Sequence, residues 1–313
     1  MKICLAAMAI IAALGPVAAE DAPGDASGHA CVEFRSDVAR ALVAKPDPIH
    51  VNNLLFDAAR KGCASLLPAL KDAGASPLAR DRLGDVALAH AARMGRVGMV
   101  AALLAADAAT RETELNRPDV VGSTPLLIAA LADRGATAKQ LIEAGADVNV
   151  ANRQGETALS AAAYNADFEL VTELLAHGAK PATIDRAGKS PILYAAARGQ
   201  DGIVAALLDA GIDANARYGA ELTALMWAAG HADNAPAGGA LRTVQLLLAR
   251  GAKLDFVDDR GRGALMIAAQ LGHTELVDAL LTAGADKTLK DKTGKTALDL
   301  AGNAEIQALL TAR

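Results

Sequence analysis

Residues 147–178 read DVNVANRQGETALSAAAYNADFELVTELLAHG, and the same pattern returns along most of the chain. Each copy opens with Asp or Asn, continues with Gly and then Thr or Ser, and ends with a small apolar segment, a turn and a Leu-rich segment. The Thr or Ser can cap the start of a helix, and a closing Gly such as Gly178 can adopt the left-handed conformation that ends one. One copy therefore predicts two short antiparallel helices.

The pattern has a period of about 33 residues, which is typical of repeat proteins. Equivalent triplets begin at residues 53, 86, 124, 157, 190, 223, 263 and 296. Two intervals exceed the period, so we place insertions at residues 108–118 and 231–240. Because one pair of short helices cannot bury its apolar face alone, the units are expected to stack on one another.

The motifs in residues 147–178 resemble those of the ankyrin-repeat family, whose unit is a β-turn followed by two antiparallel helices. The resemblance implies an all-α ankyrin-repeat solenoid of about eight helix-turn-helix units with β-turn fingers. The expected units are residues 49–80, 81–116, 117–150, 151–183, 184–216, 217–256, 257–289 and 290–313. Residues 31–48 are expected to form an N-terminal capping helix, and residues 20–30 a disordered lead.

The family has a characteristic His in the first helix that bonds neighbouring turns, and this chain lacks it. The residues at that position are Phe56, Ala89, Leu127, Ser160, Leu193, Met226, Met266 and Asp299. We therefore expect apolar packing to replace this bonding, and the turns to be less rigid than the family norm.

The first 19 residues have the pattern of a secretory signal peptide. Lys2 precedes an apolar run at residues 3–14, and small residues precede the predicted cleavage after Ala19. The run is shorter than the roughly 20 residues that a membrane-spanning helix needs, and no other run is longer. We therefore expect a periplasmic or secreted protein without membrane insertion after signal removal. The formal net charge of -5 also argues against a nucleic-acid partner.

After signal removal, Cys31 and Cys63 are the remaining cysteines. In an oxidising compartment they are a candidate disulfide. The alternative is two buried thiols.

Motifs for catalysis are missing from the sequence. It has no HExxH, CxxC, phosphate-binding loop or Gly-x-Ser-x-Gly motif, so we predict neither an enzyme nor a cofactor or metal site. His231 and Asp233 in the second insertion are the one pair considered for acid/base or metal chemistry. A solvated loop is the favoured interpretation, because two polar residues do not make a site.

The resemblance implies a partner on the concave face, which the first helices and turns form. We predict a contact stripe of Ile128, Tyr194, Trp227 and Ile267, which occupy one aligned position of the first helix. The alternative is that these side chains fill grooves between repeats.

Basic residues also recur at one position of the turns, namely Arg82, Arg153, Arg186, Arg260 and Lys292. They could steer an acidic partner, or be ordinary solvated turn residues. The expected function is that of an exported protein-protein interaction module. The alternative is a carrier of a small apolar ligand in the groove around Tyr194 and Trp227.

Overall fold

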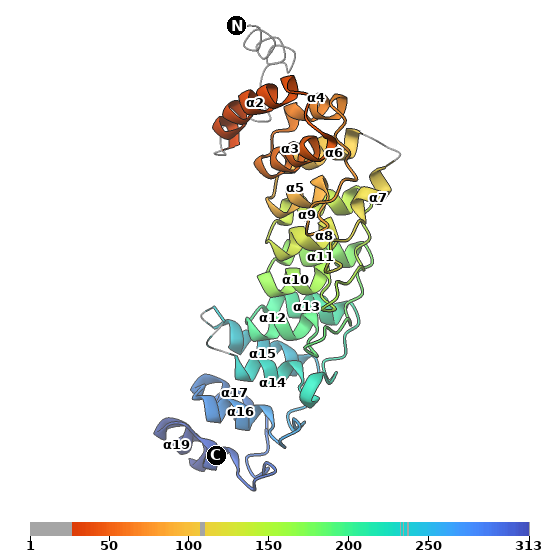
Figure 1. The fold of residues 1–313 in the computed structure, drawn as a ribbon. Helices are drawn as coiled ribbons and strands as arrows, with labels where there is room; N and C mark the ends of the chain where they lie inside the picture. Colours follow the sequence, from red (N-terminus) through yellow and green to blue (C-terminus); the bar gives the residue numbers. More distant parts are fainter. Residues whose placement is uncertain (1–26, 107–109, 232, 234, 237, 313) are drawn as a thin grey trace. The chain divides into compact units, whose positions relative to one another are not determined.

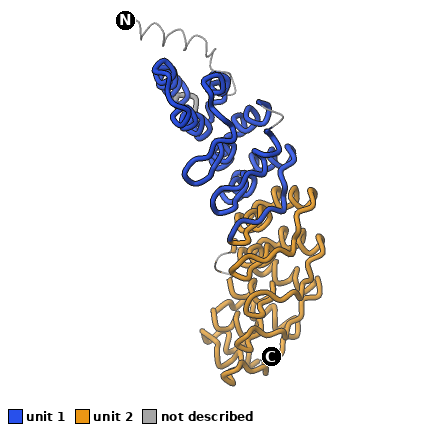
Figure 2. Tube along the Cα trace, turned by 45° about the vertical axis from the view of Figure 1, so that its right-hand side comes forward, with its two compact units in different colours: residues 1–153 blue, residues 154–313 orange. Residues whose placement is uncertain are grey.

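The computed structural model describes residues 27–106, 110–231, 233, 235–236 and 238–312 (Figure 1). The chain divides into two compact units, which meet in sequence between Arg153 and Gln154 (Figure 2). The predicted signal peptide, residues 1–19, lies outside the described residues. The described parts are helical and contain no β-sheet, so the all-α ankyrin-repeat fold class is confirmed.

The first unit begins with a long helix and continues with paired helices. Its elements are α2 (Ser27–Val43), α3 (Pro48–Lys61), η2 (Ala64–Leu66), α4 (Leu67–Asp72), α5 (Ala87–Arg93), α6 (Val97–Ala106), α7 (Arg111–Leu115), α8 (Pro125–Leu131) and α9 (Gly135–Glu143). Helices α3, α5 and α8 pack in one row, while α6 and α9 pack in a second row. Each unit of the sequence pattern thus supplies one helix to each row.

The second unit has the same two-row arrangement. Its elements are α10 (Ala158–Asn165), α11 (Phe168–Ala176), α12 (Pro191–Ala197), α13 (Asp201–Asp209), η3 (Gly219–Glu221), α14 (Ala224–Gly230), α15 (Gly239–Ala249), α16 (Ala264–Leu271), α17 (Thr274–Thr282), α18 (Ala297–Leu300) and α19 (Ala304–Ala312). The even-numbered helices pack in a row as the first helices of their repeats. The odd-numbered helices pack as the second.

The core follows the sequence period. One Ala in each of the first seven first helices is at most 1% exposed, at positions Ala59, Ala92, Ala130, Ala163, Ala196, Ala229 and Ala269. One Leu in the second helix of each of the same seven repeats is equally buried, at positions Leu70, Leu103, Leu141, Leu174, Leu207, Leu247 and Leu280. The small Ala side chains let the first helices approach closely, and the Leu side chains fill the space between the two helix rows.

Threonine caps begin several of the first helices, as the sequence predicts. Thr124 accepts a hydrogen bond from the N–H of Leu127, and Thr157 forms a capping box with Ser160. Pro125 and Pro191 lie in the first helical turns, where a missing N–H costs nothing. Ser190 differs from this pattern, because its side chain makes no capping hydrogen bond.

Backbone hydrogen bonds join neighbouring turns within each unit. In the first unit the N–H of Val120 donates to the carbonyl of Leu83 at 2.9 Å. In the second unit the N–H of Arg186 donates to Gln154 at 2.8 Å, and that of Lys292 donates to Arg260 at 2.9 Å. These bonds do not depend on the missing family His. Apolar packing was expected to replace the His-mediated bonding, and the structure shows that backbone hydrogen bonds also join the turns.

Helix α2 covers the first repeat and is covalently attached to it. Phe34 and Val38 are buried where α2 packs on α3, and Cys31 forms a disulfide with Cys63. The predicted disulfide is thus present in the structure. Residues 27–30, which were expected in a disordered lead, belong to α2, and residues 20–26 lie outside the described part.

The described parts of both predicted insertions contact the repeats. The first contains α7, whose Leu115 is 2% exposed. In the second, α15 begins at Gly239, before the predicted end of the loop. A Cβ built on Gly199 would lie 2.5 Å from the Cβ of Ala235, so the loop rests directly on the preceding repeat. Among the described residues, no helix is both long and apolar enough to span a membrane.

Candidate functional site

Tyr194 and Trp227 lie on neighbouring first helices of the second unit, α12 and α14. Both side chains are half-buried, so part of each ring faces solvent. The Tyr194 hydroxyl donates a hydrogen bond to Oδ2 of Asp185. Asp185 is itself held by the turn, because its Oδ1 accepts from the N–H groups of Ala187 and Lys189 at 2.8 and 2.9 Å. Tyr194 is therefore anchored to the turn of its own repeat.

The surroundings of Tyr194 change its acid-base behaviour. Burial raises the pKa of Tyr194 above its usual value of 10.0, and the hydrogen bond to the Asp185 carboxylate raises it further. The negative charge of Asp185 adds to the effect, because a second negative charge beside a carboxylate is unfavourable. Tyr194 is thus a neutral hydrogen-bond donor across the physiological pH range.

Lys189 lies close to both of these aromatic rings. Lys189 Nζ lies 5.5 Å from the centre of the Tyr194 ring and 5.1 Å from that of Trp227. Both distances are within the range of a cation-π interaction, which contributes about 0.5–1 kcal/mol at exposed sites. The Lys189 ammonium therefore bridges the two aromatic side chains.

A stacked pair extends the surface from Trp227. The rings of Trp227 and His231 are 4.3 Å apart with an angle of 6° between their planes. His231 Nδ1 also lies 3.1 Å from the carbonyl oxygen of Trp227. The indole Nε1 of Trp227 finds no acceptor among the described residues. Stacking on His231 thus fixes the indole ring without using its N–H group.

Tyr164 extends the surface from Tyr194 in the other direction. The two rings meet edge to face at 5.6 Å, and the Arg198 guanidinium lies 5.4 Å from the Tyr164 ring. Tyr164 is 54% exposed. We call this group the aromatic cluster, and it consists of Tyr164, Lys189, Tyr194, Arg198, Trp227 and His231.

The predicted contact stripe divides into exposed and buried members. Ile128 in the first unit is 3% exposed, and Ile267 in the second unit is 7% exposed. Both isoleucines pack into the core and offer little surface, which is the placement that the groove-filling alternative describes. Tyr194 and Trp227 share their aligned position but are partly exposed to solvent. Contact of any of the four with a partner stays a prediction.

All of the predicted basic turn residues are exposed, namely Arg82, Arg153, Arg186, Arg260 and Lys292. Within the described residues, none of them forms an ion pair. Their backbones take part in the bonding between turns, as at Arg186 and Lys292. Contact of these side chains with a partner stays a prediction.

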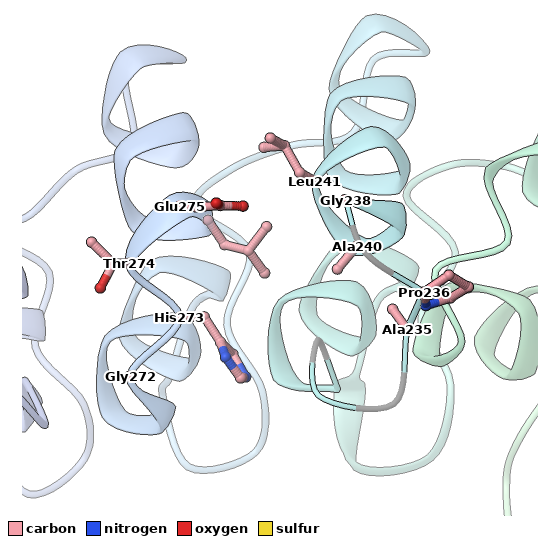
Figure 3. Close-up of a pocket in the computed structure, with 10 residues that line it drawn as sticks. Ala235, Pro236, Gly238, Ala240, Leu241, Gly272, His273, Thr274 and Glu275 are labelled. Carbon is pink, nitrogen blue, oxygen red and sulfur yellow. The ribbon is translucent and has the colours of Figure 1, made fainter.

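His231 and Asp233 have different contacts in the structure. His231 stacks on Trp227, whereas Asp233 Oδ1 lies 3.8 Å from Nδ1 of His273. Figure 3 shows a pocket of about 370 Å³ beside His273, between the start of α17 and the loop that leads into α15. Tyr194 and Trp227 do not line it. His231 and Asp233 therefore do not form a shared acid/base or metal site.

The chain matches the family model described as ankyrin repeats (3 copies) over four overlapping ranges, residues 55–152, 134–218, 159–237 and 225–312. It belongs to the ankyrin-repeat family. This ankyrin-repeat chain is 28% identical to the nuclear factor NF-kappa-B p105 subunit of Gallus gallus over 222 residues. The match covers 64% of this chain and 22% of that protein.

Two other relatives of this ankyrin-repeat chain are an ankyrin repeat and KH domain-containing protein and a bacterial protein. The first, mask-1 of Caenorhabditis elegans, is 34% identical over 201 residues, which cover 64% of this chain and 7% of mask-1. The second, an ankyrin repeat-containing protein of Treponema pallidum, is 36% identical over 124 residues, or 40% of each chain. The chain thus spans less than half the length of each of these relatives, so the likeness concerns the repeats.

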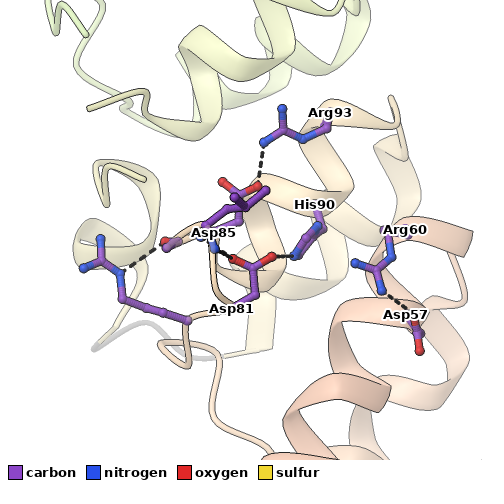
Figure 4. A network of polar contacts seen from close by, with 9 residues as sticks. Asp57, Arg60, Asp81, Asp85, His90 and Arg93 are labelled. Carbon is purple, nitrogen blue, oxygen red and sulfur yellow. Dashed lines mark hydrogen bonds and ion pairs between the residues drawn. The ribbon is translucent and has the colours of Figure 1, made fainter. Parts of the chain in front are cut away.

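The ankyrin-repeat chain also holds a polar cluster that the sequence did not indicate as a site. Asp81 and Asp85 lie in the turn that opens the second repeat, and His90 follows on α5 (Figure 4). Burial lowers the pKa of His90 below its usual value, against the opposing charges of Asp85 and Asp81. The three positions match no familiar short motif, because a turn separates the two acids from the helix that carries His90.

Proposed function

We propose that this chain is an exported protein-binding module whose partner docks on the aromatic cluster. Ankyrin repeats are in general protein-protein interaction modules, and their stacked first helices and turns offer an extended surface. The observation that carries the proposal is the pair of half-exposed rings at Tyr194 and Trp227, which Lys189 bridges. Tyr and Trp are the residues that most often anchor a protein interface.

The cluster is also held in place before binding. Asp185 fixes Tyr194, and His231 stacks on Trp227. Because side chains that are already ordered lose little conformational entropy on binding, such anchors add affinity. A preorganised aromatic surface therefore favours specific binding of one partner over nonspecific hydrophobic binding.

The charges around the cluster support a partner with an acidic surface. Lys189 and Arg198 belong to the cluster, and Arg186 lies exposed on the same turn as Lys189. Complementary charge mainly raises the association rate and adds specificity. Affinity for the partner is therefore expected to fall as the salt concentration rises.

Export is the second part of the proposal. It rests on the signal-like residues 1–19 and is supported by the disulfide between Cys31 and Cys63, because disulfides persist mainly in oxidising compartments. The proposed location is the periplasm or, alternatively, the cell exterior.

Crosslinking in the native compartment followed by mass spectrometry tests the proposal. The wild type is compared with a Tyr194→Ala, Trp227→Ala variant and with a Phe168→Ala, Leu271→Ala control. The control removes two large apolar side chains of the same unit that are 49% and 51% exposed and lie outside the cluster. A protein captured by the wild type and the control but not by the cluster variant supports the proposal. Equal capture by all three, or a bound apolar small molecule in place of a protein, contradicts it.

A further inference from the structure

Three potential metal ligands converge in the second repeat of the first unit. Asp81, Asp85 and His90 each offer one ligand atom within 4.8 Å of the others. His90 Nε2 lies 3.1 Å from Asp81 Oδ2, and Figure 4 shows the imidazole pointing at that carboxylate. The loop before α5 brings the two acids together, because Asp81 Oδ1 accepts hydrogen bonds from the N–H groups of Leu83 and Asp85 at 2.8 and 3.0 Å. His90 follows in the first turn of α5.

Two ligand atoms of this cluster are buried and unsatisfied. Asp85 is 1% exposed, and its Oδ1 has no hydrogen-bond partner among the described residues. His90 is 5% exposed, and its Nε2 is close to Asp81 but not aligned for a hydrogen bond. Buried polar atoms are nearly always paired, since leaving one unpaired costs about 1–3 kcal/mol. Both atoms therefore have binding capacity that the described residues leave unused.

Other repeats satisfy the same positions internally. In the fifth repeat the residue aligned with His90 is Tyr194, whose hydroxyl donates to Asp185. In the seventh repeat the residue aligned with Asp85 is Arg262, whose Nη2 lies 2.8 Å from Oδ2 of Asp258. The fifth and seventh repeats carry Lys189 and Arg262 at the position of Asp85, whereas the second repeat places a second acid beside Asp81.

We propose that Asp81, Asp85 and His90 form a binding site for a divalent transition-metal ion of the Zn²⁺ type. One imidazole nitrogen and two carboxylate oxygens are ligands that Zn²⁺ accepts, and three protein ligands leave a fourth position for water. Tetrahedral ligands at Zn²⁺ distances lie about 3.3 Å apart, which is close to the separation between His90 Nε2 and Asp81 Oδ2.

Arg93 and Phe56 support the ligands from outside. Arg93 Nη2 lies 2.5 Å from Asp85 Oδ2, which leaves Oδ1 for the metal and fixes the plane of the carboxylate. The Phe56 ring packs on the His90 ring at 5.2 Å and so holds the imidazole in place. A metal bound here would tie the turn of the second repeat to α5.

Zn²⁺ titration of the full chain without an affinity tag tests the site. After chelator treatment, equilibrium dialysis against Zn²⁺ is expected to give about one equivalent bound per chain, with a rise in Tm. His90→Phe keeps a ring against Phe56 but removes the nitrogen, and Asp85→Asn keeps an oxygen for Arg93 but removes the charge. Each substitution is expected to weaken Zn²⁺ binding at least about tenfold.

His50→Ala serves as the matched control, because His50 is an exposed histidine of the same unit. Its Zn²⁺ affinity should equal that of the wild type. Circular dichroism shows whether each variant folds. If one of the two site variants does not fold, the other one provides the test. No bound Zn²⁺ in the wild type overturns the proposal. Unchanged affinity in His90→Phe also overturns it, because the ion would then sit on surface histidines only.

Discussion

At the residue scale, the aligned first-helix position is buried in some repeats and partly exposed in others. Ile128 and Ile267 end within the packed layer, whereas Tyr194 and Trp227 extend beyond it. The sequence period was enough to place these residues at equivalent positions. It could not reveal that Lys189 bridges two rings, because that contact depends on side-chain rotamers rather than on spacing.

The raised pKa of Tyr194 predicts a loss of stability in base. The unfolded chain releases the phenol proton near pH 10, while the folded chain keeps it to higher pH. The stabilisation is therefore complete below about pH 10 and falls as the pH rises further. Denaturant unfolding of wild type and Tyr194→Phe should show a shallower decline for the variant above about pH 10. Burial also raises the pKa of Tyr218, which contributes equally to both proteins, so parallel declines would contradict the assignment.

At the scale of single elements, glycines with left-handed backbone conformation differ in the space around their Cβ position. Gly251 ends a helix with φ of 84° and has open space around its Cβ position. Gly261 has a similar φ of 82°, but a Cβ there would lie 2.9 Å from the nitrogen of Lys292. The backbone of the next turn therefore approaches Gly261 too closely for a side chain.

This pair makes a matched prediction for the bonding between turns. Gly251→Ala should cost about 1–2 kcal/mol of unfolding free energy through backbone strain alone. Gly261→Ala should cost more, because it also displaces the Lys292 N–H from the carbonyl of Arg260. Denaturant unfolding of both variants measures the difference. Equal losses would show that the close approach of the turns does not contribute.

The disulfide makes a second prediction at this scale. Cys31 and Cys63 are 32 residues apart, and a loop of that length should contribute about 3–4 kcal/mol. Replacing both with Ala should lower the unfolding free energy by that amount and speed amide hydrogen exchange in α2 first. Adding a reductant to the variant is the control and should change nothing. Unchanged exchange in α2 would contradict the capping role of the disulfide.

Sequence and structure agree best where the cause of an element is local. Thr124 and Pro125 predict the start of α8, and the structure confirms it. The start of α2 at Ser27 was not predicted, because the burial of Phe34 and Val38 and the bond to Cys63 stabilise that helix from a distance. The polar cluster was missed for a similar reason, since the turn geometry that joins Asp81 to His90 leaves no short motif.

At the scale of the whole molecule, the repeats and the proposed export are separate features. The family profile covers residues 55–312 through overlapping matches, whereas the signal-like residues 1–19 lie outside it. Intact mass and N-terminal sequencing of the protein from its native cell test the export proposal. A mature chain that begins at Glu20 in the periplasmic or external fraction is expected. An uncleaved chain in the cytoplasmic fraction would contradict the proposal.

The affinity of the crosslinked partner for the purified chain tests the binding role most directly. Trp227→Ala and Tyr194→Ala should each weaken binding at least about tenfold, because aromatic anchors of this kind carry much of the binding energy. Phe168→Ala, which removes an exposed ring outside the cluster, should leave the Kd within about threefold of the wild type. If the two cluster variants bind as tightly as the wild type, the partner does not dock on this surface and the account is wrong.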